Sequence, residues 1–352
     1  MEVVGQKKSV GKTSRRDVLK RGGALGLAGV GLASGIGTRR AVAQTGRIKV
    51  NVINGGGSLS LLQVVLLKEL KLFEKYNIEP NLLNVSDSAK ILVGLISGEG
   101  DICAGAGYNG LFPAIDRGAK VKIVAGANLA PLNILYSSKP DIKSVKDLPG
   151  RTMGTGPLGA LLHLQAVAVM KKHGVDYKKV NFANVGSSVD VFKSLVAGNI
   201  DAGVAPIEFR DTASKFKLQP LVDGEIWKEL PLYANQAMFA SDKAIAEKRQ
   251  GLIGVIAAYG DMFRWMANPA NKQAYLAYYK KAISNGSDEE GAFMQDFLSK
   301  PGALATDLVL TEAQLTYVQE LNIEVGGQKN MVPFSQCADM SLAQEALKLI
   351  KA

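Results

Sequence analysis

Two stretches of the chain, Leu95–Asp101 (LISGEGD) and Leu195–Asp201 (LVAGNID), share the pattern Leu-x-x-Gly-x-x-Asp at an offset of 100 residues. In each stretch a helical pattern of apolar residues stops at the glycine, and a strand pattern begins at the aspartate. The sequence therefore predicts the same helix-to-strand connection twice, about one lobe-length apart.

The residues around the first stretch predict a lobe of alternating strands and helices over residues 46–137. The expected strands are 47–54, 81–85, 101–105, 121–127 and 134–137, and the expected helices are 58–76, 86–98 and 109–117. Ser58 is the expected N-cap of the first helix, because a serine hydroxyl accepts a hydrogen bond from the first helical turn. Asn77 is the expected end of that helix, since asparagine tolerates the left-handed conformation.

The second stretch lies in a repeat of this scheme over residues 138–234. The expected strands are 151–154, 180–184 and 201–205, and the expected helices follow the loops 155–159 and 186–188 and end near residues 173 and 198. Residues 235–352 predict a return to the first lobe, with a strand at 237–240 and helices at 252–266, 273–283, 291–298, 312–321 and 342–350. This alternation predicts an α/β fold of two lobes, each a doubly wound, mostly parallel sheet, with C-terminal helices.

Residues 1–43 predict an export signal. Ser14–Lys20 (SRRDVLK) resembles the twin-arginine motif, a stretch rich in Gly and Ala follows, and Ala41–Ala43 offers small residues to signal peptidase. That stretch is too short and too rich in glycine for a stable membrane span. We expect cleavage near Ala43, export through the twin-arginine translocase and a soluble periplasmic protein. A chance arginine pair on an amphipathic helix is the alternative.

Most of the formal net charge of +10 lies in this segment, which holds nine Lys and Arg against two acidic residues. The rest of the chain has a net charge of +3 and no basic patch with interleaved aromatics, so the sequence predicts no nucleic-acid partner. Cys103 lies in an apolar run and is expected to be buried. The sequence leaves open whether it pairs with Cys337.

Loops at the carboxyl ends of the expected strands are the candidate binding site, because helix N-termini gather there in open parallel sheets. The candidate ligand-binding residues in and beside these loops are Gly57, Ser58, Tyr108, Asn109, Thr155, Gly156, Leu158, Ser187, Glu208 and Arg210. Glu208 could accept hydrogen bonds from an amine or amidine, and Arg210 could hold a carboxylate or sulfonate. Tight turns and solvated charges are the alternative explanation of the same residues.

The sequence gives little support for catalysis. His163 and His173 are the only histidines and lie ten residues apart in one expected helix, so their side chains point in different directions. His163 is expected to be packed rather than to act as a base. No cysteine–histidine cluster with metal spacing occurs. Residues 154–159 (GTGPLG) match G-x-G-x-x-G in letter, but a proline lies in the turn and no acidic residue ends the following strand, so they are expected to form a general ligand loop rather than a phosphate site. We expect a protein that is not an enzyme and has no metal or cofactor.

Several sequence motifs typical of one protein family occur along the chain from about residue 46 to 350. They are the two Leu-x-x-Gly-x-x-Asp stretches with their strands, residues 142–154 (IKSVKDLPGRTMG) and residues 73–80 (FEKYNIEP). With these the chain resembles the solute-binding proteins of ABC importers, in particular the nitrate–taurine (NitT/TauT) group. Asn77 stands where that group often has glycine. Members bind nitrate, taurine, other alkanesulfonates, bicarbonate or pyrimidine precursors of thiamine.

The resemblance implies a two-lobed periplasmic-binding-protein type II fold, with the candidate loops lining the cleft. It also implies a function, which is the capture of a small solute such as a sulfonate, nitrate or carboxylate by closure of the lobes. A membrane permease and an ATPase subunit would be the partners. The alternatives are a protein that binds a thiamine pyrimidine or another nitrogen heterocycle, delivery to a sensor or another transporter, and a periplasmic enzyme on the same fold.

Overall fold

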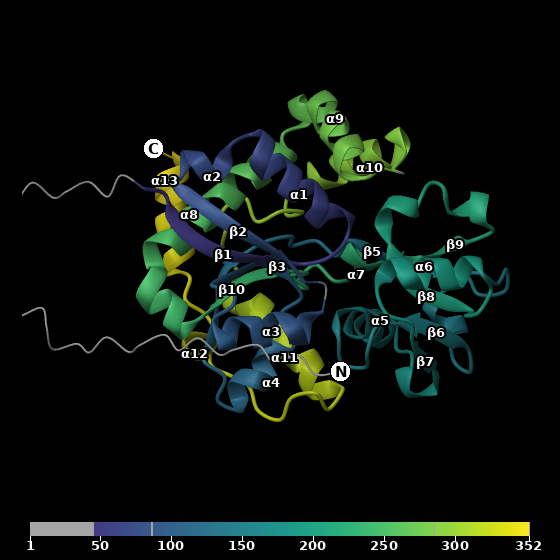
Figure 1. Cartoon of the computed structure of the whole chain (residues 1–352). Coiled ribbons are helices and arrows are strands. Elements are labelled where there is room, and N and C mark those ends of the chain that lie inside the picture. Colours follow the sequence, from purple (N-terminus) through teal and green to yellow (C-terminus); the bar gives the residue numbers. More distant parts are fainter. Residues whose placement is uncertain (1–45, 86, 285, 352) are drawn as a thin grey trace, which may run out of the picture. The chain divides into compact units, whose positions relative to one another are not determined.

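Two five-stranded sheets organise the part of the chain that the computed structural model describes, which is residues 46–85, 87–284 and 286–351 (Figure 1). The predicted export segment, residues 1–43, and its cleavage site near Ala43 lie outside these residues. Both sheets are mixed, each with two parallel and two antiparallel strand pairings, and both carry helices, so the predicted α/β fold with two lobes is confirmed.

The first sheet has the strand order β2-β1-β3-β10-β4. Its strands are β1 (Ile48–Asn54), β2 (Ile78–Asn84), β3 (Ile102–Ala106), β4 (Val121–Gly126) and β10 (Ala237–Ser241). Strand β1 pairs in parallel with β2 and β3, and β10 lies antiparallel between β3 and β4. The chain thus returns to the first sheet after it has built the second.

The second sheet has the equivalent order β7-β6-β8-β5-β9. Its strands are β5 (Asn133–Ser137), β6 (Thr152–Thr155), β7 (Asn181–Asn184), β8 (Ala202–Pro206) and β9 (Gln219–Glu225). Strand β6 pairs in parallel with β7 and β8, and β5 lies antiparallel between β8 and β9.

The position of β5 corrects the predicted lobe boundary. Residues 134–137 were expected to complete the first lobe, but β5 hydrogen-bonds only with strands of the second sheet among the described residues. Every residue of β5 is buried. A strand buried on both faces has no alternation that would assign it to one sheet, so its sequence could not show which sheet it joins. Strand β9 was not expected from the sequence.

The helices are α1 (Ser58–Glu69), α2 (Leu72–Lys75), α3 (Ser88–Ser97), α4 (Leu111–Asp116), α5 (Leu161–Lys172), α6 (Ser188–Val196), α7 (Ile226–Glu229), α8 (Asp242–Ala267), α9 (Lys272–Ala282), α10 (Asp288–Leu298), α11 (Glu312–Glu324), α12 (Phe334–Cys337) and α13 (Ser341–Lys351). The single helix expected at 58–76 is divided, because Lys71 adopts a left-handed conformation with φ of 52° between α1 and α2. Helix α8 starts ten residues before the predicted start and bends at Lys248. In the described residues, no helix has the length and apolar character needed to cross a bilayer.

The repeated Leu-x-x-Gly-x-x-Asp pattern makes the same connection in both lobes. Gly98 and Gly198 follow α3 and α6 with φ of 84° and 73°, a left-handed conformation that glycine adopts without strain. Asp101 and the first strand, β1, exchange two hydrogen bonds, since the Asp101 carboxylate accepts from the Asn51 N–H at 2.8 Å and the Asp101 N–H donates to the Asn51 carbonyl. Asp201 repeats both bonds with Thr152 of β6.

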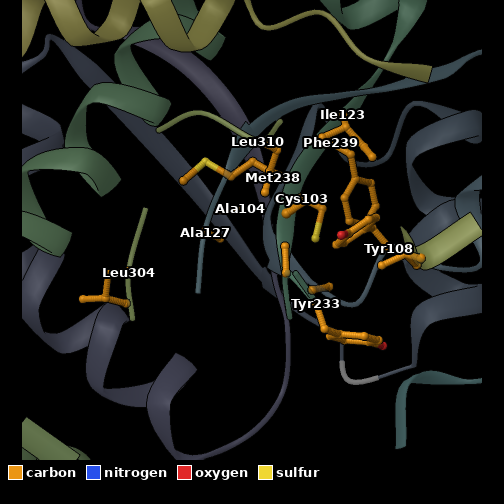
Figure 2. Close-up of a cluster of buried hydrophobic side chains, with 14 of the residues drawn as sticks. Cys103, Ala104, Tyr108, Ile123, Ala127, Tyr233, Met238, Phe239, Leu304 and Leu310 are labelled. Carbon is orange, nitrogen blue, oxygen red and sulfur yellow. The ribbon is translucent and has the colours of Figure 1, made fainter. Parts of the chain in front are cut away.

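The core of the first lobe lies around β3 and β10. Figure 2 shows Cys103 beside Met238 and Phe239, with Tyr108 and Tyr233 in the same cluster. Cys103 is buried, as expected, and burial raises the pKa of its thiol to about 12. Cys337 is also buried, and both cysteines are free thiols in this structure.

Candidate functional site

A cavity of about 280 Å³ lies where the two lobes face each other. Its walls come from the loop before α1, the loops before α5 and α6, the turn after β8, and helices α9 and α10. Helix α9 packs on α1 of the first lobe, and α10 packs on the turn Ile207–Phe209 of the second. Helices α9 and α10 therefore close the cavity on a side where the sequence predicted no wall.

Two antiparallel chain segments connect the lobes beside the cavity. The Gln236 N–H donates to the Asn128 carbonyl and the Asn235 N–H to the Leu129 carbonyl, each at 2.9 Å. The Asn128 side chain also donates to the Gln236 side chain at 2.6 Å. Asn128, Asn235 and Gln236 all line the cavity, so the hinge supplies polar groups to the site.

Helices α1 and α5 begin at the cavity with free backbone donors. Gly57, not Ser58, is the N-cap of α1, and its φ of 106° is a conformation that glycine adopts readily. Neither N-cap, Gly57 nor Ala160, caps its helix with a side chain, and no other described side chain bonds to the first N–H groups. Both helices therefore offer unpaired N–H groups to acceptor atoms of a ligand.

Helix α6 also begins at the cavity but carries its own cap. The Ser187 hydroxyl accepts from the Asp190 N–H, and the Asp190 carboxylate accepts from the Ser187 N–H at 3.1 Å and from its hydroxyl at 2.6 Å. Ser187 therefore lines the cavity with its hydroxyl already bonded within the helix.

Glu208 is the only acidic side chain among the described residues that line the cavity, and neither Lys, Arg nor His is found among them. It follows β8 in the turn Ile207–Phe209, is partly exposed and lines the cavity. Burial raises the pKa of Glu208 to about 7, and the carboxylate of Glu290 on α10 adds to the rise. In the described part of the chain, Glu208 forms no ion pair.

Tyr275 and Tyr279 line the cavity one helical turn apart on α9, with stacked rings whose centroids are 6.3 Å apart. Both are buried, and the Tyr275 hydroxyl has no hydrogen-bond partner in the described residues. Sequence reasoning missed both residues because they lie in the C-terminal helices, far from the strand ends. Their spacing of four residues was the available signal, since it places two aromatics on one helix face.

Of the predicted site residues, Gly57, Ser58, Gly156, Ser187 and Glu208 line the cavity. The others, Tyr108, Asn109, Thr155, Leu158 and Arg210, lie outside its lining.

Burial or exposure distinguishes three of the residues outside the lining. Tyr108 is buried in the core of the first lobe and packs edge-on against Phe112. Figure 2 shows Tyr108 within the buried cluster that includes Phe239. Thr155 is fully buried, and its hydroxyl donates to the Gly156 carbonyl. Leu158 is 69% exposed. All three residues lie outside the lining of this cavity.

The two remaining residues are engaged in other contacts. The Asn109 side chain donates to the Gly159 carbonyl in the opposite lobe at 2.6 Å. Arg210 lies on the surface and pairs with Glu225 at 2.7 Å and with Asp211 at 3.0 Å. Arg210 is therefore not available to hold an anion in the cavity.

Both histidines have structural contacts. His163 is buried, its Nδ1 accepts from the Gly159 N–H at 3.1 Å, and burial lowers its pKa. This confirms that His163 is packed. His173 contacts Glu229 at 3.0 Å. No cluster of three or more metal-ligating side chains occurs in the described residues.

Comparison with solved structures shows the same fold in proteins of different function. A putative periplasmic sulfonate-binding protein of an ABC transporter from Methylobacillus flagellatus aligns with a TM-score of 0.66 at 15% identity, covering 87% of this chain and 95% of its own. The periplasmic nitrate-binding protein of Synechocystis aligns with a TM-score of 0.67 at 10% identity, covering 86% and 89%. A desulfurization enzyme aligns with a TM-score of 0.57 at 13% identity, covering 85% and 99%.

No curated protein matches the chain in sequence. A family model does match, over residues 62–270, which is more than half of the chain and spans strands of both lobes. The expected periplasmic-binding-protein fold is confirmed by the structural alignments. On the strength of the family match, the chain belongs to the NMT1/THI5-like family.

Proposed function

We propose that this chain is the solute-binding subunit of an ABC importer, which captures a small solute between its two lobes. The observation that carries the proposal is the cavity of about 280 Å³ whose walls come from both lobes. A cavity of this size and lining is typical of small-molecule sites. The fold shared with sulfonate- and nitrate-binding proteins supports the same function.

The mechanism follows from the division of the site. Ser58 of the first lobe and Gly156 of the second both line the cavity, so a solute gains the contacts of both only when the lobes close. Solute binding therefore shifts the population toward the closed form. The paired connecting segments at Asn128 and Gln236 are the place where this rotation would occur.

A membrane permease that reads closure, together with its ATPase subunit, is the partner in this proposal. The twin-arginine motif at Arg15 and Arg16 supports export of the folded protein, with the periplasm as its place of action. Delivery to a sensor or to another kind of transporter is compatible with the same cavity, and a pull-down with the solute-loaded protein would distinguish these partners.

An exported enzyme on the same fold is the second candidate, because a desulfurization enzyme shares the architecture. The titratable side chains among the described lining residues are those of Glu208, Tyr275 and Tyr279. Recovery of the bound compound unchanged after long incubation would favour the binding protein, and its conversion would favour the enzyme.

A melting-temperature screen tests the proposal. The purified protein is unfolded and refolded to remove any bound solute, and is then mixed with sulfonates, nitrate, carboxylates, aminopyrimidines and other amines. A solute at a hundred times its dissociation constant stabilises the folded state by about 2.7 kcal/mol, which raises Tm by several degrees. If no compound raises Tm and mass spectrometry finds no solute in the protein as first purified, the proposal is wrong.

A further inference from the structure

The charge of the cavity differs from what an anion site requires. Sulfonate and nitrate are anions, yet the described lining residues include Glu208 and no cationic side chain. A carboxylate repels an anion at close range, whereas it attracts a cation or a hydrogen-bond donor. Arg210, the one cation that the sequence offered for this role, is paired on the surface with Glu225 and Asp211.

The surroundings of Glu208 leave it without a counterion. A buried carboxylate loses its hydration and is costly unless it is paired or hydrogen-bonded. Glu290 on α10 is the other charged group that influences Glu208, and it carries the same sign. A ligand group with positive charge would therefore supply the missing partner.

Two tyrosine side chains, Tyr275 and Tyr279, share the cavity with the Glu208 carboxylate. Burial raises the pKa of both hydroxyls, and the charge of Glu208 adds to the rise. The rings offer π surface to a cation, and the unpartnered Tyr275 hydroxyl is free to hydrogen-bond.

We propose that Glu208, Tyr275 and Tyr279 form a subsite for an amine or amidine group of the transported solute. The subsite rests on the proposed function, since it assigns chemistry to the same cavity. The carboxylate accepts hydrogen bonds from the ligand's N–H groups, and the tyrosine rings contact the cation. The free N–H groups at the start of α1 and α5 remain for acceptor atoms elsewhere on the solute.

Matched probes test this chemistry. Benzylamine, benzamidine, benzyl alcohol, benzoate and benzenesulfonate share a ring and differ in the head group. Butylamine, butanol, butyrate and butane-1-sulfonate repeat the comparison on an aliphatic chain. The full chain, unfolded and refolded to remove bound solute, is titrated with each probe, and Tm and Kd are measured near neutral pH. We expect amine and amidine probes to bind and the carboxylates and sulfonates of the same size to bind at least tenfold more weakly.

Variants separate Glu208 from general effects of charge. Glu208→Gln keeps the shape and removes the charge, so we expect it to weaken binding of the amine probes by about tenfold or more. Glu320→Gln makes the same change at an exposed position of α11 outside the cavity and should bind as the parent protein does. Tyr275→Phe removes only the unpartnered hydroxyl and should cause a smaller loss. The Tm of each variant without ligand shows that it folds.

The outcomes distinguish the subsite from the proposed function. Tighter binding of carboxylates or sulfonates than of amines, or equal amine affinity in Glu208→Gln and the parent, overturns the subsite and leaves solute binding intact. If no probe binds and no solute accompanies the purified protein, both the subsite and the proposed function are overturned.

Discussion

The side-chain amide of Asn109 donates a 2.6 Å hydrogen bond to the carbonyl oxygen of Gly159 and so joins the first lobe to the second. The Asn109 carbonyl is itself fixed, because it accepts from the Asn322 side chain at 2.7 Å. Gly107 and Leu161, which flank this contact in the chain, both line the cavity. The bond is therefore a direct contact between the two lobes beside the cavity.

Removing this bond should weaken solute binding. In Asn109→Ala the closed form loses one hydrogen bond between the lobes, worth about 1 kcal/mol, so affinity should fall about fivefold. Calorimetric titration of each variant with the solute measures this change in affinity. Asn181→Ala is the matched control, because the Asn181 side chain donates to the Gly150 carbonyl within one lobe. Equal affinities of the two variants would contradict a role for Asn109 in closure.

The stability of the unliganded protein should depend on pH through the protonation of Glu208. The pKa of Glu208 in the folded protein, about 7, lies above the ordinary glutamate value of 4.5. The folded state therefore holds the proton more tightly, and this contribution to stability is complete below about pH 4.5 and is lost as the pH rises through 7. Glu208→Gln should remove this decline, so the Tm difference between variant and parent should grow from pH 5 to pH 8. A constant difference would contradict the raised pKa.

Gly198 should be sensitive to replacement although it has space around it. A methyl group at Gly198 meets no described atom within 4 Å, but its φ of 73° is unfavourable for other residues. Gly198→Ala should cost about 1 kcal/mol in the free energy of unfolding. Gly110, with equally open surroundings and a φ of −69°, is the control, and Gly110→Ala should leave stability unchanged or raise it. Urea unfolding measures the free energy of unfolding of both variants. Equal losses of stability in the two variants would show that the positive φ of Gly198 is not the cause.

The two repeated aspartates should differ in their contribution to stability. Asp101 has a side chain only 7% exposed and pairs with Lys248 at 2.8 Å, whereas Asp201 is 26% exposed and its nearest lysine, Lys139, is 3.8 Å away. Since buried, partnered carboxylates are costlier to lose, Asp101→Ala should destabilise by about 3 kcal/mol and Asp201→Ala by about 1 kcal/mol. Urea unfolding measures both. A larger loss for Asp201→Ala would contradict the comparison.

The sequence predicted those features that depend on local pattern. Turn glycines and strand ends are local, so the amino-acid pattern alone was enough to select Gly57, Ser187 and Glu208 as candidates, and these residues line the cavity. The fold class followed from the repeated stretches ending at Asp101 and Asp201, because each fixes a helix end and a strand start within seven residues.

The remaining features depend on contacts between distant segments. Which side chains of a loop enter a cavity is decided by packing, and this is why Thr155 and Leu158 were expected in the lining but lie outside it. Tyr275 and Tyr279 reach the cavity because α9 packs on α1, more than two hundred residues earlier in the chain. The sheet that β5 joins could not be predicted either, because the sequence of a fully buried strand does not indicate which strands pair with it.

The return of β10 to the first sheet determines the order in which the two sheets can be completed during synthesis at the ribosome. When residue 234 has been made, the second sheet has all five of its strands, while β4 of the first still lacks the neighbour that joins it to β3. Only the emergence of β10 fills that place. The lobe that leaves the ribosome first is thus the last to be completed, and a chain truncated before Ala237 would present an open sheet edge to chaperones.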